Sequence, residues 1–166
     1  AAEARARRLS ETLELTTRLL GLARGEPFLR DLLVRFLRAS PPRLYAATEA
    51  FEFARWLETR HGFDVPLLRE VLRFEIALER VALTGGTVLV NFHHDPGVVL
   101  GALAEGRLPD APGKGEFLME VAGDPAGEGP FRLAVVEGRW RTLEPLPRRP
   151  GWPYAGRRPV LACVPA

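Results

Sequence analysis

The chain has 166 residues, of which 46% are hydrophobic and 27% charged, and its formal net charge is +2. This length suits one domain, or two small modules that share a core. No apolar run is long enough to cross a bilayer and no signal-peptide pattern is present, so we expect a cytoplasmic protein without membrane contact. The single cysteine, Cys163, excludes an internal disulfide and agrees with a reducing compartment.

The content of lysine and of amide side chains is unusually low. Lys114 is the only lysine, Asn91 is the only asparagine, and glutamine is absent. This composition is typical of a GC-rich genome and favours a thermophilic origin. The chain starts at Ala1 without a methionine, which leaves open that it is the C-terminal domain of a longer polypeptide.

Residues 1–84 predict four helices. Apolar residues recur at helical spacing from Leu9 to Leu20, and two nearby glycines mark the end of this first helix. A second helix has Pro27 in its first turn and stops at Ser40, which two prolines follow. The apolar stripe of the second helix comprises Leu29, Leu32, Leu33, Phe36 and Leu37.

Two further helices complete the predicted bundle. Pro42 can open the third helix, which ends at His61 and the following glycine. Asp64 is a suitable N-cap for the fourth helix, which Gly85 and its neighbouring glycine end. Connections this short favour antiparallel neighbours, and therefore a bundle. The stripe of the fourth helix comprises Leu67, Val71, Phe74, Leu78 and Val81.

After residue 86 the apolar period changes from helical to alternating. Val88, Val90 and Phe92 predict one face of a strand, and the residues between them predict the other face. Further strands are predicted over 117–121, 131–135 and 160–164, with one short helix over 95–103. The predicted fold is α+β: a helical bundle over 1–84, then a small mixed or antiparallel sheet module with one short helix over 85–166, with one core shared between them.

We find no catalytic set. The Gly85–Gly86 pair has the spacing of neither a Walker loop nor a dinucleotide fingerprint, and no nucleophile elbow is present. We therefore expect a protein that is not an enzyme by itself, without catalytic residues, metal or cofactor.

Among the motifs of the sequence, the cluster His93-His94-Asp95 most resembles a metal-binding or catalytic site. Neighbouring side chains of a strand point to opposite faces, so only His93 and Asp95 could share a face, whereas zinc needs three or four protein ligands. We interpret Asp95 as the N-cap of the short helix. A metal-dependent enzyme built on His93 and Asp95 remains an alternative.

The carboxylates of the helices are interpreted as a solvated face. Glu70 and Arg73 are spaced to pair along one helix, as are Glu75 and Arg80 less ideally. Glu75 is the exception, because it lies beside the core stripe, where we expect it to hold two helices in register. The carboxylates considered are Glu49, Glu52, Glu70, Glu75 and Glu79.

The basic charge of the chain is concentrated near its end. Residues 139–159 hold six arginines and one acid, whereas residues 1–138 hold 17 basic and 20 acidic residues. Arginine beside aromatic rings suits anionic or peptide partners, although arginines that pair with the acidic helical half would explain the pattern equally well. The predicted partner-binding residues are Arg139, Trp140, Arg141, Arg148, Arg149, Trp152 and Tyr154.

Two segments resemble a known family. Residues 63–83, FDVPLLREVLRFEIALERVAL, and residues 90–109, VNFHHDPGVVLGALAEGRLP, are similar to a helix and to a strand, short helix and turn of HvfC-type proteins. These are partner proteins of multinuclear non-haem iron oxidases that modify ribosomally made peptides. The resemblance implies that an oxidase barrel, in a separate chain or fused in front of this one, holds the iron, and that this chain helps to present the precursor peptide.

Two functions of different classes follow. The first is a non-catalytic accessory domain that binds an oxidase and a precursor peptide, the peptide being added as a strand to a free sheet edge. The alternative is a nucleic-acid-binding regulator, since proteins related to this family have also been described as DNA-binding domains. The acidic helical half, which offers no basic recognition helix, makes nucleic acid the less favoured partner.

Overall fold

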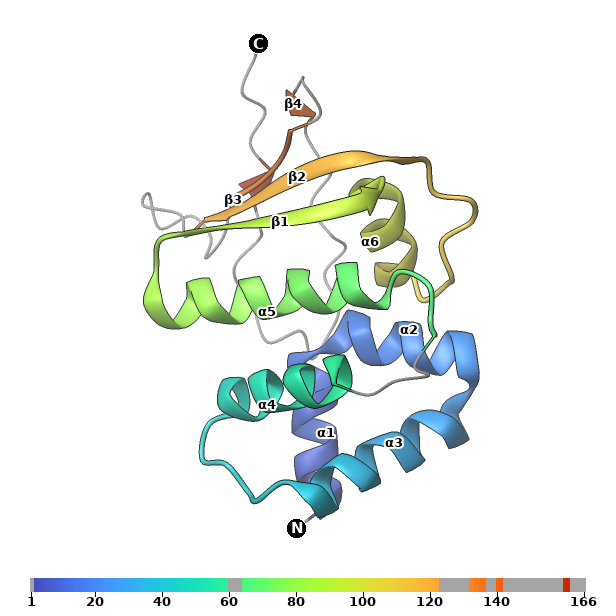
Figure 1. Ribbon diagram of the computed structural model, residues 1–166, viewed down its shortest axis with the longest axis vertical. Helices are drawn as coiled ribbons and strands as arrows, with labels where there is room; N and C mark the ends of the chain where they lie inside the picture. The colour runs from blue at the N-terminus through green and yellow to red at the C-terminus, as the bar shows by residue number, and fades with distance from the viewer. Residues whose placement is uncertain (1, 60–63, 123–131, 137–139, 142–159, 162–166) are drawn as a thin grey trace.

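The computed structural model describes residues 2–59, 64–122, 132–136, 140–141 and 160–161, the last three segments by their backbone. Helices come first and strands follow, which confirms the α+β prediction (Figure 1). The helices are α1 (Ala2–Thr12), α2 (Glu14–Arg24), α3 (Glu26–Ala39), α4 (Ala46–Glu58), α5 (Leu68–Thr84) and α6 (Pro96–Ala104). The strands are β1 (Thr87–His94), β2 (Lys114–Ala122), β3 (Arg132–Val136), β4 (Trp140–Arg141) and β5 (Val160–Leu161).

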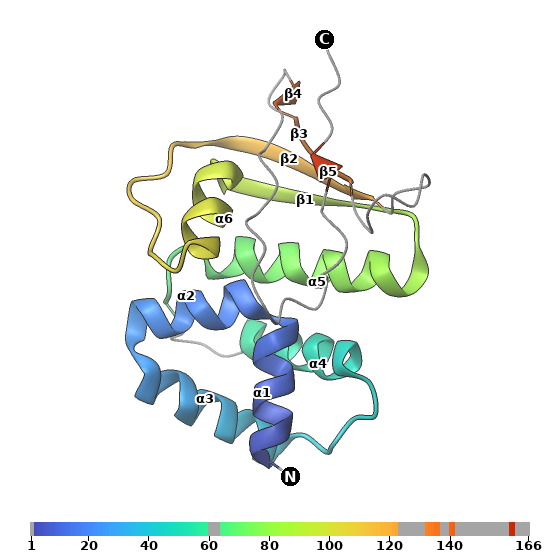
Figure 2. The ribbon, with the colours of Figure 1, turned by 180° about the vertical axis from the view of Figure 1, so that it is seen from behind.

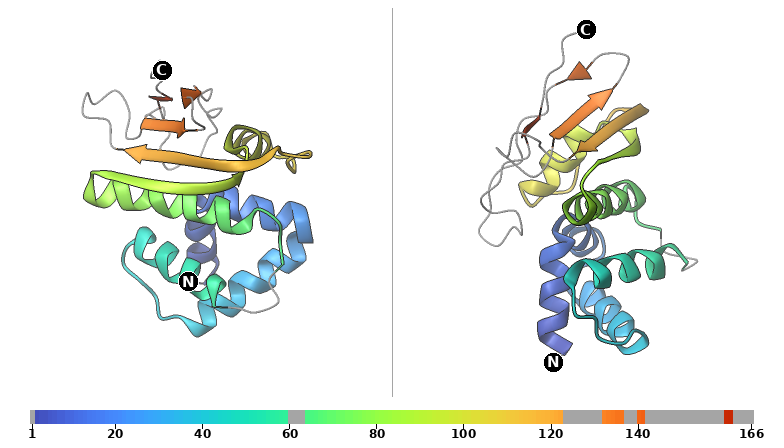
Figure 3. Two further views of the ribbon diagram at one scale, coloured as in Figure 1. Left: turned by 45° about the horizontal axis from the view of Figure 1, so that its top comes forward. Right: turned by 90° about the vertical axis from the view of Figure 1, so that its left-hand side faces the viewer.

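Helix α5 lies between the helices α1–α4 and the sheet (Figure 1). It packs against α2 and α4 on one side and against β1 on the other, so the layers follow one another as bundle, α5 and sheet (Figure 3). The rings of Phe74 on α5 and Phe92 on β1 meet edge to face at 6.3 Å, and both are fully buried. Phe36 and Phe53 fill the bundle in the same way, with ring centroids 5.0 Å apart. One cluster of buried apolar side chains therefore runs from the bundle into the sheet.

The sheet is mixed, as β1, β2, β3 and β4 pair antiparallel in that order and β5 pairs parallel with β3. Val90 and Phe92 are buried against α5, whereas Leu89, Asn91 and His93 are exposed, which confirms the predicted alternation. Among the described strands β1 pairs with β2 alone and so forms an edge of the sheet.

The segment predicted as one helix over 9–20 is in fact two helices, α1 and α2, which run in different directions (Figure 2). The bend occurs at Leu13, with φ −113° and ψ 56°. In a continuous helix, the N–H groups of Leu15 and Thr16 would bond to carbonyls one turn earlier. Here they donate instead to the carboxylate of Glu75 on α5, at 2.7 and 2.8 Å. A side chain that enters the helical ladder in this way produces a sharp kink.

The predicted start of α4 at Pro42 is also wrong, because the helix begins at Ala46. Arginines of α1 bind carbonyl groups of the preceding segment. Arg5 donates to the carbonyl of Ser40 at 3.2 Å, and Arg8 donates to that of Arg43 at 3.0 Å. The Arg43 carbonyl, which would accept an N–H group of the next turn in a helix that started at Pro42, accepts a hydrogen bond from α1.

Asp64 does not cap α5, contrary to the prediction. The helix begins at Leu68, after Leu67 in a left-handed conformation with φ 69°. The residues before the helix form a turn, in which the Leu68 N–H donates to the Val65 carbonyl at 3.2 Å. The side chains of Leu68 and Val65 are both buried. Burial of two large apolar side chains stabilises the chain by more than a local cap does. The predicted end of the helix is confirmed, since Gly85 has φ 67° and its N–H donates to the Val81 carbonyl at 2.8 Å.

Candidate binding groove beside strand β1

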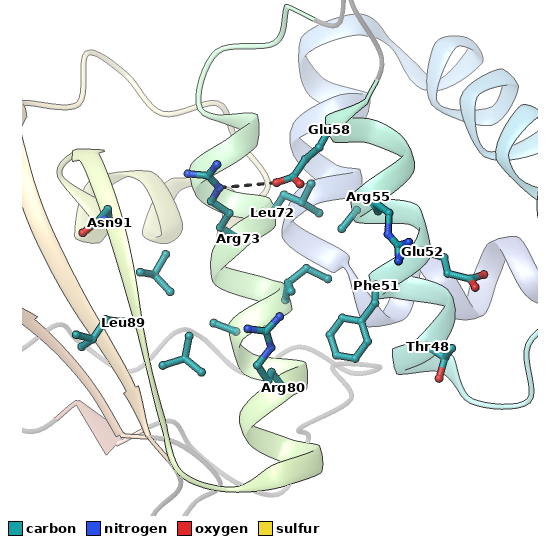
Figure 4. Close-up of a pocket in the computed structure, with 15 residues that line it drawn as sticks. Thr48, Phe51, Glu52, Arg55, Glu58, Leu72, Arg73, Arg80, Leu89 and Asn91 are labelled. Carbon is teal, nitrogen blue, oxygen red and sulfur yellow. Dashed lines mark ion pairs between the residues drawn. The ribbon is translucent and has the colours of Figure 1, made fainter.

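A groove of about 720 Å³ lies between α4, α5 and β1. We call it the β1 groove. Its volume falls within the range of about 300–1,000 Å³ that is usual for ligand sites. Figure 4 shows β1 along one side of the groove, α5 in the middle and α4 on the other side. The groove is lined by Thr48, Phe51, Glu52, Ala54, Arg55, Glu58, Leu72, Arg73, Ile76, Ala77, Arg80, Val88, Leu89, Val90 and Asn91.

Strand β1 contributes its backbone edge to the groove. Four consecutive residues, 88–91, line it, although their side chains alternate between the two faces of the sheet. What these four residues share is the main chain on the side away from β2. In an edge strand, the N–H and C=O groups of alternate residues point away from the paired neighbour. Leu89 is 57% exposed, and Thr87–Asn91 holds neither proline nor charge, the usual protection of an edge.

Helix α5 contributes a row of residues one turn apart. Arg73, Ile76 and Arg80 are spaced to lie on one helix face, and all three line the groove. Seven residues of helix span about 10 Å. Three steps along β1, from Val88 to Asn91, span about 10 Å as well. The strand edge and the helix row are therefore matched in length.

The charge inside the groove is unevenly compensated. Both of its carboxylates have partners: Glu52 pairs with Arg43 at 2.5 Å, and Glu58 pairs with Arg73 at 3.8 Å. The hydrogen bond from Arg43 lowers the pKa of Glu52, and the nearby Arg55 contributes to this shift. Within the described part of the chain, neither Arg55 nor Arg80 makes a side-chain hydrogen bond or ion pair. The groove therefore has positive charge available for a partner.

Most of the partner-binding residues predicted from the sequence lie outside the described residues. This applies to Arg139, Arg148, Arg149, Trp152 and Tyr154. The backbones of Trp140 and Arg141 form β4, which pairs with Val136 and Val135 of β3. In the strand order β4 is separated from β1 by β2 and β3, so these two residues do not belong to the β1 groove.

The solvated face predicted for the helical carboxylates other than Glu75 is wrong for three of the four, because Glu49, Glu70 and Glu79 are buried. Glu49 is 1% exposed and accepts hydrogen bonds from Arg5 at 2.8 Å and from Arg8 at 3.1 Å. This network joins α1 to α4. Glu49 therefore acts as a structural connection between two helices, and the sequence signal that could have indicated its burial is its position beside an apolar stripe.

Glu75 confirms the expectation that it holds two helices in register. It receives the two backbone N–H groups of α2, and burial raises its pKa to about 7. The hydrogen bonds that it accepts oppose this shift without cancelling it.

Glu70 does not pair with Arg73, as the spacing had suggested. One of its oxygens lies 2.9 Å from Nδ1 of His94 at the end of β1, while Arg73 is paired with Glu58. Asp95 accepts the N–H of Gly97 at 2.9 Å and caps α6, as predicted. The three residues of the His93-His94-Asp95 cluster therefore do not converge. In the described ranges no group of three or more His, Cys, Asp or Glu could hold a metal ion.

No family model, curated protein or solved structure matches this chain. None of the helices in the described ranges is long and apolar enough to cross a membrane.

Proposed function

We propose that this protein is a non-catalytic accessory domain that binds an extended peptide along the edge of β1. The observation that carries the proposal is the exposed edge of residues 88–91, set beside a groove of about 720 Å³. A peptide strand added there would form main-chain hydrogen bonds with β1, and side chains of every second residue would enter the groove. Main-chain pairing provides affinity for any extended segment, and the groove provides selectivity.

The proposal extends to the kind of partner. The similarity of residues 63–83 and 90–109 to HvfC-type proteins supports an iron-dependent oxidase as the protein to which the peptide is presented. In the structure these segments form most of α5, the second half of β1, and α6. Two of these elements line the β1 groove, so the residues that suggested the family also lie at the site.

A nucleic-acid-binding role is the second candidate, because the groove holds Arg55, Arg73 and Arg80. Against it, Glu52 and Glu58 lie among these arginines, which would repel a phosphate backbone. Binding to DNA that falls steeply with salt, together with failure to bind any peptide, would favour this candidate over the first.

Amide hydrogen exchange tests the peptide site directly. The chain is co-expressed with whatever protein is encoded beside it or fused in front of it, the complex is analysed for iron, and exchange is measured with and without a candidate precursor peptide. We expect slower exchange at the alternate residues of 88–91 whose N–H groups point away from β2, because these groups would become bonded to the peptide. Residues 118–121 of β2 are the internal control, since β2 is already paired on both sides. Unchanged exchange at β1 in a complex that holds the peptide would contradict the proposal.

A further inference from the structure

The charged and apolar residues of the β1 groove follow a definite order along α5. In Figure 4, Arg80 lies level with Leu89 of β1, and Arg73 lies level with Asn91. Ile76, which is partly buried against the core, comes between the two arginines in the sequence of the helix. A strand laid against β1 would therefore pass one arginine, then an apolar residue, then the other arginine.

The two arginines are not equivalent. Arg73 already has Glu58 at 3.8 Å, whereas the Arg80 side chain makes no ion pair among the described residues. Phe51 of α4 lies across the groove from Arg80 (Figure 4) and is only partly exposed. A guanidinium group in such a partly apolar setting forms forked hydrogen bonds with a carboxylate more readily than an ammonium group does.

The spacing of helix and strand also agrees. Arg80 and Ile76 are four residues apart on α5, which corresponds to about 6 Å along the helix axis. Side chains on the same face of an added strand are two residues apart, about 7 Å. One groove-facing side chain of the peptide can thus meet Arg80 while the next one covers Ile76.

We propose that the β1 groove selects an extended peptide in which an acidic side chain faces Arg80 and an apolar side chain two residues away covers Ile76. This inference rests on the proposed function and adds the chemical class of the peptide. Both carboxylates of the groove are paired, whereas Arg80 is not. A lysine or arginine at the peptide position that faces Arg80 is therefore excluded, because like charges would face each other.

Three synthetic peptides test the selection. Each has seven residues, with threonine at odd positions, valine at the second and sixth positions, and glutamate, glutamine or lysine at the fourth. The ends are blocked by acetyl and amide groups, and binding is followed by fluorescence anisotropy at low ionic strength. We expect the glutamate peptide to bind about tenfold more tightly than the lysine peptide, a ratio that decreases as salt is added.

Two variants of the protein sharpen the test. Arg80→Glu should reverse the order of the glutamate and lysine peptides, since the charge that selects is inverted. Arg69→Glu is the matched control, because Arg69 is an exposed arginine of the same helix that does not line the groove. It should leave the order unchanged.

The outcomes separate the two proposals. Equal affinities for the three peptides, or an order that Arg80→Glu does not alter, would overturn the inference and leave the peptide site of β1 in place. Failure of all three peptides to bind, with no protection of residues 88–91, would overturn the peptide site and the inference together. Preference for the lysine peptide would overturn the inference alone.

Discussion

The helical layer and the edge of β1 use polar groups in opposite ways. In the helices, buried carboxylates form hydrogen bonds within the fold: Glu49 binds two arginines of α1, and Glu75 binds two backbone N–H groups of α2. At β1, the outward backbone groups of residues 88–91 and the guanidinium of Arg80 have no such use among the described residues. The difference teaches which polar groups hold the fold together and which are available to a partner.

The largest expected effect is at Glu49. Replacing it by alanine leaves Arg5, whose side chain is 14% exposed, without its charged partner, so we expect a loss of about 3–5 kcal/mol in the free energy of unfolding. Glu11→Ala is the matched control, because Glu11 forms an exposed pair with Arg7 that should contribute less than about 1 kcal/mol. Urea denaturation measures both. Similar losses in the two variants would mean that the buried network does not hold α1 in place.

The second effect is a dependence of stability on pH. The pKa of Glu75 is raised from 4.5 to about 7 in the folded protein, so the folded state binds this proton more tightly than the unfolded chain does. Its contribution to stability is fully present below about pH 4.5 and is lost as the pH rises through about 7. At about 1.4 kcal/mol for each pKa unit, the loss is on the order of 3 kcal/mol.

Glu75→Gln isolates this contribution. The amide of the variant does not titrate. As the pH rises from about 5 to about 8, the native protein should therefore lose stability relative to the variant, measured as the difference between their free energies of unfolding. Urea denaturation at several pH values in this range provides the measurement. A difference that stays constant with pH would show that Glu75 keeps the same charge state throughout.

The smallest effect on stability is expected in the groove. Arg80→Gln removes a charge that pairs with nothing among the described residues, so the free energy of unfolding should change by less than about 0.5 kcal/mol. Binding of the glutamate peptide should nevertheless weaken severalfold. A large loss of stability in this variant would show that Arg80 holds the fold together, as the buried helical carboxylates do. It would contradict the conclusion that Arg80 is available to a partner.

The features predicted correctly from the sequence are those set by neighbouring residues. The alternation of Val88, Val90 and Phe92 is a local pattern, as are the cap at Asp95 and the glycine stop at Gly85. Each depends on residues within a few positions, and local rules describe them well.

The features that were missed depend on distant residues. The break at Leu13 is caused by Glu75, 60 positions from Leu15 in the chain, and the late start of α4 follows from contacts with α1. The β1 groove likewise combines three elements that are separate in the sequence. No window of one sequence contains both partners of such contacts, so helical spacing alone predicted a continuous first helix.

The bond between Glu75 and α2 also has a consequence for how the chain folds. No signal in the local sequence ends a helix between α1 and α2, and most helical stability in proteins comes from tertiary packing, so we expect an isolated N-terminal segment to be only partly helical and to lack a fixed bend. Glu75 of α5 supplies the carboxylate that binds the backbone beside the bend at Leu13. The bend directs α2 toward α6, where Arg18 donates to the carbonyl of Leu103 at 2.7 Å. We therefore expect the N-terminal fold to be completed only after α5 has been synthesised, because Glu75 follows Leu15 by 60 positions in the chain.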